Sequence, residues 1–210
     1  MFVTFEGVEG CGKTTQAALL KENLEKEGRR VVFSREPGGT EVGERIREIL
    51  LDRRLKGMEP LAELFLYLAS RAQHVKELIG PALKEGAIVV CDRYADAGVA
   101  YQGAARGIGV SQVLLLNRWA TFGVVPDYTV LIDLPVETGL KRKVHGAGGI
   151  AERDRIEQEK PEFHAKVREA YLELARESSN RVEIFDGSLP ESRLAADILT
   201  RVNTILGSRK

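Results

Sequence analysis

Apolar residues in this chain follow two patterns, short continuous runs and longer stretches in which they recur at helical spacing. The short runs are rich in β-branched and aromatic residues, which favour strands. The run at residues 87–91 is apolar throughout, as is typical of a strand covered on both faces. We predict strands at residues 2–5, 30–34, 87–91, 128–134 and 182–185.

Between these runs, apolar residues stand three and four positions apart, as in amphipathic helices. We predict helices at residues 15–27, 41–51, 60–79, 111–122, 136–143, 161–177 and 190–206. Gly28 is expected to end the first helix, Pro81 to end or kink the third, and Ser111 to cap the fourth. Residues 95–109 are rich in Gly and Ala, which predicts irregular backbone packed closely against a neighbouring element.

Strands that alternate with helices predict an α/β fold, with three α/β/α layers around a mainly parallel sheet. A chain of 210 residues can bury one such domain and is short for two, so we predict a single domain over residues 1–210. Ligands of a parallel sheet bind beyond the carboxyl ends of its strands, where functional residues are therefore expected.

The composition argues against several classes of protein. Lys plus Arg equals Asp plus Glu at 31 each, and this neutral balance argues against a nucleic-acid partner. No apolar run approaches the roughly 18 residues of a membrane span, and the amino terminus shows no signal-peptide pattern. Two cysteines are too few for a disulfide framework or a four-ligand zinc site. We therefore expect a cytoplasmic enzyme without a membrane partner.

The loop between the first predicted strand and helix carries the strongest chemical signal. Residues 7–14 fit the spacing G-x-x-x-x-G-K-[ST], in which backbone N–H groups and the Lys bind phosphates and the hydroxyl meets Mg²⁺. The helix that follows sets its N-terminus against the same anion. We interpret Cys11 as a small loop residue rather than a reactive thiol. The residues expected to bind the nucleoside triphosphate are Gly7, Glu9, Gly10, Cys11, Gly12, Lys13, Thr14 and Thr15.

Charged residues at two further strand ends extend this site. Asp92 follows the strand at residues 87–91 and is placed to hold Mg²⁺, directly or through water, opposite the Thr14 hydroxyl. Arg35 and Arg93 lie at neighbouring strand ends, where two guanidinium groups can bind a second phosphate group. The sequence therefore predicts a metal site and a second phosphate site beside the loop.

Four blocks of sequence resemble the thymidylate kinase family and occur in the family's order across nearly the whole chain. They are residues 5–15 (FEGVEGCGKTT), 35–40 (REPGGT), 92–94 with 100–103 (DRY and AYQG) and 154–157 (DRIE). The resemblance implies transfer of the ATP γ-phosphoryl group to dTMP with Mg²⁺, which yields ADP and dTDP for dTTP synthesis. It also implies a five-stranded sheet in the order 2-3-1-4-5 and a homodimer formed through helices.

The resemblance implies roles for residues at matching positions. Arg71 corresponds to the arginine that donates to a thymine carbonyl, and Tyr67 to the aromatic residue, more often Phe, that stacks on the base. Tyr101 resembles the residue that crowds the sugar 2′-position, and Glu9 the acid that approaches the 3′-hydroxyl. The full set implied for dTMP is Glu9, Arg35, Pro37, Tyr67, Arg71, Arg93, Ala97, Gly98, Tyr101 and Gln102.

One subgroup of the family has a catalytic arginine in the phosphate loop, where this chain has Gly10 and Cys11. The other subgroup has that arginine in a lid, which we place at about residues 143–156 and expect to be mobile because residues 144–150 contain three glycines. Arg142, at its base, is expected to stack on the donor adenine. The catalytic candidates are Lys13, Arg93, Arg153 and Arg155.

Two other functions stay open from the sequence. A kinase for another nucleoside monophosphate would differ only in its acceptor residues, and a non-catalytic nucleotide-binding module would share the phosphate loop. A GTPase would need a guanine-reading N-K-x-D segment, which the chain lacks. Leu114, Leu115, Leu116 and Trp119 form an apolar surface compatible with either a core or an interface.

Overall fold

A sheet of five parallel strands lies at the centre of the computed structural model, which describes residues 1–145 and 154–208. Its order is β2-β3-β1-β4-β5, as the family resemblance implied. The predicted strands are confirmed to within one residue at each end. They are β1 (Phe2–Glu6), β2 (Val31–Arg35), β3 (Ile88–Asp92), β4 (Tyr128–Asp133) and β5 (Val182–Asp186).

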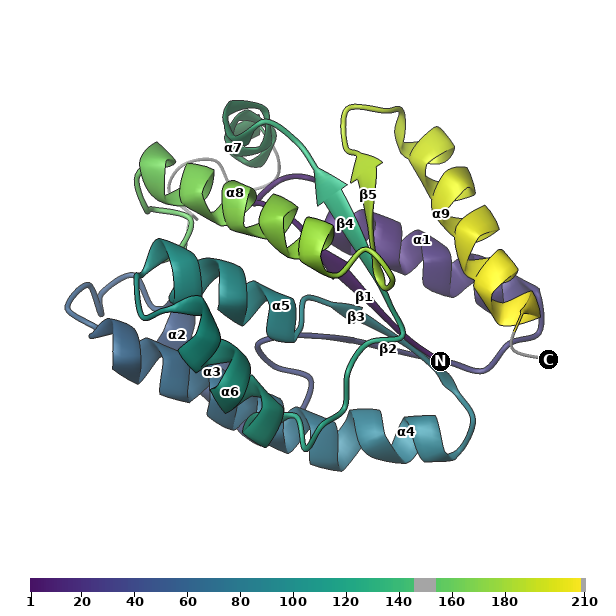
Figure 1. The fold of residues 1–210 in the computed structure, drawn as a ribbon, viewed down its shortest axis with the longest axis horizontal. Coiled ribbons are helices and arrows are strands. Elements are labelled where there is room, and N and C mark those ends of the chain that lie inside the picture. The colour runs from purple at the N-terminus through teal and green to yellow at the C-terminus, as the bar shows by residue number, and fades with distance from the viewer. Residues whose placement is uncertain (146–153, 209–210) are drawn as a thin grey trace.

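Helices cover both faces of this sheet, which confirms the three-layer arrangement (Figure 1). On one side α1 (Lys13–Lys26) packs against α9 (Glu191–Gly207), and on the other α8 (Pro161–Glu177) packs against β4 and β5. The other helices are α2 (Glu41–Leu51), α3 (Pro60–His74), α4 (Gly80–Lys84), α5 (Ala95–Gly98), α6 (Val110–Ala120) and α7 (Val136–His145), with π-helical segments η1 (Val75–Ile79) and η2 (Val99–Ala105). Every helix within residues 1–145 and 154–208 is too short or too polar to traverse a lipid bilayer.

The pairing of the strands brings candidate functional residues to one edge of the sheet. Asp92 at the end of β3 lies opposite both Phe5 of β1 and Arg35 of β2. The carboxyl ends of these three strands are therefore level, and the loops that follow them meet above the same edge.

Helix ends follow the sequence signals at Gly28 but not at Pro81. Gly28 has a φ of 77° and ends the first helix as predicted. The third helix, however, continues through η1 into α4 and reaches Lys84. Pro81 lies in the first turn of α4, and the wide turn before it resets the hydrogen bonding, with Gly80 N–H donating to the Val75 carbonyl.

The segment at residues 95–109 corrects one prediction and confirms another. It is mostly helical, as α5 and η2, rather than irregular. It nevertheless packs closely against its neighbours, as its glycines predicted. A Cβ on Gly98 would touch Arg71, and one on Gly103 would press on the backbone of Val110.

The start of α6 also differs from the prediction. The helix begins at Val110, directly after Gly109 with a φ of 111°, and Ser111 donates to a neighbouring side chain instead of capping the helix. Leu115 and Trp119 are exposed, Trp119 to 76%. Of the apolar surface predicted here, Leu114, Leu115 and Trp119 are therefore turned outward in the single chain, whereas Leu116 packs against the core.

Candidate active site

The phosphate loop, residues 7–14, has the backbone that its sequence predicts. Gly7, Gly10 and Gly12 all have positive φ, which other residues rarely adopt. Gly12 begins α1 without a side-chain cap, so the N–H groups of the first turn are left for another acceptor. Lys13 Nζ donates to the Val8 carbonyl at 2.8 Å, and the loop therefore wraps around its amine.

Close packing between the loop and α7 leaves no room for a side chain at Gly10. A Cβ on Gly10 would overlap the Gly139 carbonyl, and a Cβ on Gly139 would overlap the Glu9 carbonyl. The φ of 72° at Gly10 would strain any side chain there as well. The backbone and packing at Gly10 therefore exclude an arginine at that position.

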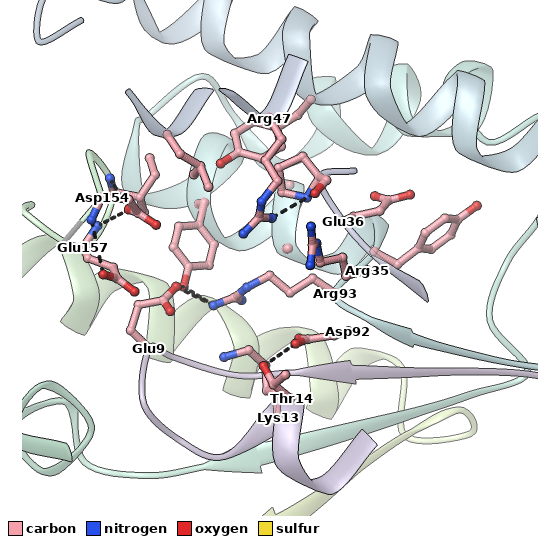
Figure 2. A pocket seen from close by; sticks show the side chains of 18 of the residues that line it. Glu9, Lys13, Thr14, Arg35, Glu36, Arg47, Asp92, Arg93, Asp154 and Glu157 are labelled. Atoms are coloured by element: carbon pink, nitrogen blue, oxygen red, sulfur yellow. Dashed lines mark hydrogen bonds and ion pairs between the residues drawn. The ribbon is translucent and has the colours of Figure 1, made fainter. Parts of the chain in front are cut away.

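The loop borders a cavity of about 570 Å³, within the size range of small-molecule sites (Figure 2). Of the described residues predicted for the site, Gly7, Cys11 and Arg155 do not line it. Arg153 and most of the predicted lid lie outside the described residues. The predicted residues that line the cavity are Glu9, Gly10, Gly12, Lys13, Thr14, Thr15, Arg35, Pro37, Tyr67, Arg71, Asp92, Arg93, Ala97, Gly98, Tyr101, Gln102 and Arg142.

Thr14 and Asp92 meet at this cavity, where Thr14 Oγ1 donates to Asp92 Oδ2 at 2.5 Å. Hydroxyl and carboxylate oxygens suit Mg²⁺, which usually takes few protein ligands and completes its shell with water and phosphate oxygens. Residues 1–145 and 154–208 hold no group of three or more His, Cys, Asp or Glu side chains suited to a metal. The pair therefore fits a metal ion that a phosphate shares, rather than a closed all-protein site.

Arg93 is the centre of a hydrogen-bond network beside the loop (Figure 2). Its guanidinium donates to Glu9, to the Tyr101 hydroxyl at 3.0 Å and to the Gly7 carbonyl at 3.0 Å. Burial alone would raise the pKa of Glu9, but Arg93 and, after it, Lys13 lower it to about 2. Glu9 is therefore a charged hydrogen-bond acceptor at neutral pH.

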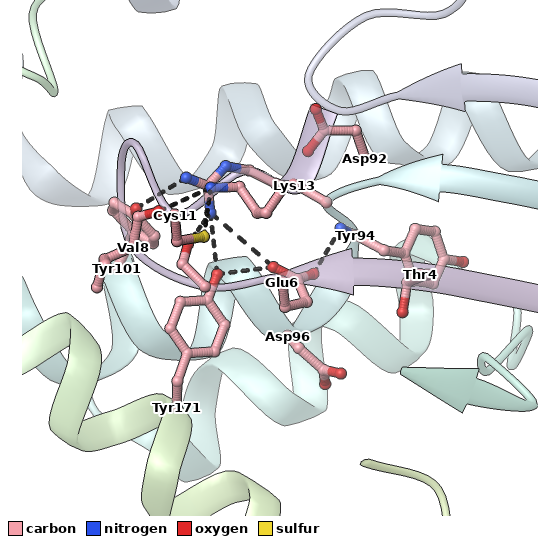
Figure 3. Close-up of polar contacts among 12 residues, drawn as sticks. Thr4, Glu6, Val8, Cys11, Lys13, Asp92, Tyr94, Asp96, Tyr101 and Tyr171 are labelled. Atoms are coloured by element: carbon pink, nitrogen blue, oxygen red, sulfur yellow. Dashed lines mark hydrogen bonds and ion pairs between the residues drawn. The ribbon is translucent and has the colours of Figure 1, made fainter. Parts of the chain in front are cut away.

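Glu6 lies behind this network and is 1% exposed. Its carboxylate accepts from the Tyr94 N–H and the Tyr171 hydroxyl, both at 2.7 Å (Figure 3). The same carboxylate lies 4.0 Å from Arg93. Burial raises the pKa of Glu6 from 4.5 to about 7, against the opposing effect of Arg93. Protonation of a buried group beside Arg93 thus occurs near neutral pH.

We expect Glu6→Gln to change how stability depends on pH. Between 4.5 and about 7, folded Glu6 holds a proton that the unfolded chain has released. The stability from this proton is full below the unfolded pKa and is lost as the pH rises through the folded one. The variant stays neutral at this position, so its free energy of unfolding, relative to that of the wild type, should rise by about 2–3 kcal/mol between about pH 5 and pH 8 in urea titrations. Parallel pH profiles of the two proteins would contradict this.

Arg71 on α3 is almost fully buried, and all three nitrogens of its guanidinium are engaged. Nε donates to Glu36 at 2.7 Å, Nη1 to Asn117 at 2.7 Å and Nη2 to the Tyr94 carbonyl at 3.0 Å. Glu36 also contacts His74 Nδ1 at 3.0 Å. Since a guanidinium has five N–H donors, this arrangement holds Arg71 rigidly and leaves donors for a ligand in the cavity that it lines.

Two further arginines line the cavity on the side of β2 and α2. Arg35 pairs with Glu44 at 3.0 Å, and Arg47 donates to the Pro37 carbonyl at 2.9 Å. Burial, followed by the neighbouring charge of Arg35, lowers the pKa of Arg47. Together with Arg93, these side chains concentrate positive charge where a phosphate group can bind.

Arg155 is held away from the cavity by Glu63, whose side chain is fully buried. Arg155 Nη1 lies 2.6 Å from Glu63 Oε2, and Arg155 Nε donates to the Leu50 carbonyl at 3.0 Å. Arg106 and Gln102 bind the same carboxylate. This pairing favours a structural role for Arg155, because a catalytic role would require the buried ion pair to open.

Arg155→Met tests this, since methionine keeps the apolar stem and removes the charge. Glu63 retains Arg106 and Gln102, so we expect a loss on the order of 2 kcal/mol, or a Tm lower by about 4–8 °C. kcat should stay within about threefold of wild type, whereas loss of a catalytic arginine would cost about 10³–10⁵-fold. Calorimetry and steady-state kinetics measure the two effects, and a large fall in kcat with an unchanged Tm would contradict the structural role.

Arg142 and Lys143 line the cavity from the end of α7. Arg142 donates to the Gly187 carbonyl at 3.0 Å, and Lys143 pairs with Glu157 at 2.7 Å. The turn after β5 therefore lies beside Arg142. The stacking of Arg142 on adenine stays a prediction.

Comparison with known proteins identifies the family. Residues 5–198 match the family model described as thymidylate kinase. The chain is 48% identical over 209 residues to a thymidylate kinase of Geotalea daltonii, and the alignment covers 96% of this chain and 98% of that protein. The chain belongs to the thymidylate kinase family.

Other members of the thymidylate kinase family agree with this assignment. A thymidylate kinase of Thermoanaerobacter sp. is 45% identical over 205 residues, or 98% of each chain. The crystal structure of a thymidylate kinase from Ehrlichia chaffeensis superposes with a TM-score of 0.76 at 30% identity, covering 97% of this chain and 98% of that one. The family and the nucleoside monophosphate kinase activity inferred from the sequence are confirmed, and the alternatives are not favoured.

Several residues that support the site of this kinase were missed in the sequence. Glu6 and Glu36 stand inside the motif blocks, which was the only signal that they matter. Arg47, Asn117 and Tyr171 lie on helices without a motif, and their contacts join segments far apart in the chain. Sequence spacing alone could not bring these side chains together.

Proposed function

We propose that this chain transfers the γ-phosphoryl group of ATP to dTMP and yields ADP and dTDP for dTTP synthesis. The observation that carries the proposal is that most of the phosphate loop and all ten residues implied for dTMP line the same cavity. Membership of the thymidylate kinase family supports the same reaction.

On the donor side, the ATP phosphates bind the N–H groups of the phosphate loop and the amine of Lys13, which lines the cavity. Thr14 and Asp92 hold Mg²⁺, an assignment supported by the contact between their oxygens. When bound, the metal neutralises charge on the β- and γ-phosphate oxygens. Arg142 stacks on the adenine beside the turn that contains Gly187.

On the acceptor side, Arg35 and Arg93 bind the dTMP phosphate and ionised Glu9 accepts from the 3′-hydroxyl. Arg71 donates to a thymine carbonyl, and Tyr67 stacks on the base. The other residues that enclose dTMP are Pro37, Ala97, Gly98, Tyr101 and Gln102.

An oxygen of the dTMP phosphate attacks the γ-phosphorus while the bond to the β-phosphate oxygen of ADP breaks. Such transfer depends on alignment and charge neutralisation. Lys13 provides both on the side of the ATP phosphates, and Arg93 on the side of the dTMP phosphate. A lid at about residues 143–156 supplies the last positive charge, and Arg153 is its candidate because Arg155 pairs with Glu63. An arginine of this kind is worth about 10³–10⁵ in rate.

The reaction is tested by ADP release with ATP, Mg²⁺ and each common nucleoside monophosphate. We expect dTMP to react fastest and dUMP, which lacks one methyl group, about 10–200-fold more slowly in kcat/KM. The amine of dCMP opposes the donors of Arg71, so dCMP should react more slowly still. Turnover of dCMP or AMP equal to that of dTMP would contradict the assignment, and ATP binding without any turnover would indicate a non-catalytic module.

We also infer that the chain folds as a single domain and forms a homodimer. We place this homodimer in the cytoplasm, where ATP and dTMP are found. The exposed apolar face of α6, with Leu115 and Trp119, supports an interface formed through helices. Light scattering should give twice the mass of one chain for the wild type. A monomer would contradict the dimer, and cell fractionation tests the location.

A further inference from the structure

Glu63 lies next to the cavity, with none of its surface exposed, and its carboxylate binds three side chains. Oε2 contacts Arg155 at 2.6 Å and Arg106 at 3.1 Å, and Oε1 accepts from Gln102 Nε2 at 2.8 Å. Burial alone would raise the pKa of Glu63, but the hydrogen bonds from Arg106 and Gln102 lower it. The group is therefore an ionised carboxylate, which can only accept hydrogen bonds.

This carboxylate determines the orientation of the Gln102 amide. The oxygen and nitrogen of an amide occupy almost the same space, so the surrounding hydrogen bonds decide which atom lies where. Only the nitrogen can face Glu63, and the carbonyl oxygen must point elsewhere. That oxygen accepts no hydrogen bond from residues 1–145 or 154–208, it is not sealed from solvent, and Gln102 lines the cavity. The amide therefore offers an acceptor to the cavity.

We propose that Glu63 is a positioning residue for base selection, which acts by holding Gln102 so that its carbonyl oxygen faces the base of the acceptor nucleotide. Glu63 and Arg71 lie two turns apart on α3, and Arg71 lines the same cavity. The cavity thus presents donors from Arg71 and an acceptor from Gln102, each fixed by a buried glutamate, Glu36 or Glu63.

The chemistry of the pyrimidines gives this arrangement its selectivity, an inference that rests on the proposed function. Thymine and uracil carry a ring N–H next to a carbonyl oxygen. The N–H matches the acceptor of Gln102, and the carbonyl oxygen matches the donors of Arg71. Cytosine carries an unprotonated ring nitrogen next to an amine, which oppose both. A Gln102 amide free to turn would accommodate either pattern, so Glu63 removes the choice.

The test compares kcat/KM for dTMP and dCMP, with ATP and Mg²⁺, in wild-type protein, Glu63→Gln and Glu63→Asp. In Glu63→Gln the new amide can meet Gln102 with either end. Glu63→Asp keeps the negative charge near Arg106 and Arg155 but shortens the side chain, which lengthens its contact with Gln102. We expect the ratio of dCMP to dTMP in kcat/KM to rise by about tenfold or more in both variants, mainly through KM.

Glu159→Gln is the matched control. Glu159 pairs with Arg106 at 2.7 Å without being a partner of Glu63 or Gln102, so its variant should keep the wild-type ratio. Folded Glu63 variants that keep this ratio, including variants that lose activity equally on both nucleotides, would overturn the proposal. Wild-type protein that fails to phosphorylate dTMP would instead overturn the proposed function.

Should neither Glu63 variant fold, the Gln102 amide itself decides. In ¹⁵N-labelled wild-type protein its signals are assigned by their loss in Gln102→Met. We expect one amide proton to be protected from exchange with water by its bond to Glu63, and Gln102→Met to raise the same dCMP to dTMP ratio. Rapid exchange of both protons, or an unchanged ratio in Gln102→Met, would overturn the proposal.

Discussion

Lys13→Ala is expected to lower kcat about 10²–10³-fold, because it removes a buried positive charge where negative charge develops during phosphoryl transfer. Only 6% of Lys13 is exposed, and its amine contacts the loop itself, at the Val8 carbonyl and Cys11. Electrostatic stabilisation is strongest in such a site, where water does not compete. ADP release at saturating ATP and dTMP measures the loss.

The fold should tolerate this change, since Lys13 contributes about one hydrogen bond to the loop. We expect the Tm to fall by only about 2–4 °C. Lys21→Ala is the matched control on the same helix, because Lys21 is half-buried, lies outside the phosphate loop and pairs with Glu25 of α1 at 3.0 Å. A tenfold loss in kcat is about what one lost hydrogen bond would cost. If folded Lys13→Ala keeps a kcat within tenfold of wild type, the phosphate loop has no part in the mechanism.

The sheet and the phosphate loop were predictable because each depends on local sequence. Apolar runs such as the one that forms β3 have few stable environments other than a sheet covered on both faces. The glycines of the loop are required by positive φ at Gly7, Gly10 and Gly12, which leaves a readable pattern. Pro81 was misread because its cost depends on the turn before it, and η1 supplies a wide turn there.

The candidate site was predictable only as far as its motifs reach. The residues implied by the family blocks meet in the cavity. The groups that orient them lie far away in the sequence, as Glu36 and Asn117 do from Arg71. Arg155 shows the same limit. Its place in the DRIE block suggested catalysis, yet the structure pairs it with Glu63, on a helix far from it in sequence.

Arg93→Ala is expected to lower kcat/KM for dTMP about 10³-fold while the affinity for ATP changes little. The guanidinium binds Glu9, Tyr101 and the Gly7 carbonyl at once, so its removal leaves an ionised Glu9 without its main partner. The variant therefore loses a phosphate-binding group and also places an unneutralised negative charge beside the acceptor phosphate. Steady-state kinetics with varied dTMP and calorimetric titration of ATP separate the two substrates.

Two further variants identify which property of Arg93 matters. Arg93→Lys keeps the charge but loses the planar fork, and we expect it to recover no more than about tenfold of the loss. Tyr171→Phe keeps Arg93 but removes the hydroxyl that accepts from Arg93 at 3.1 Å and donates to Glu6 at 2.7 Å, so kcat/KM for dTMP should fall only a few fold. If Arg93→Ala instead weakens ATP as much as dTMP, Arg93 serves the donor phosphates, because a group confined to the acceptor cannot alter both affinities equally.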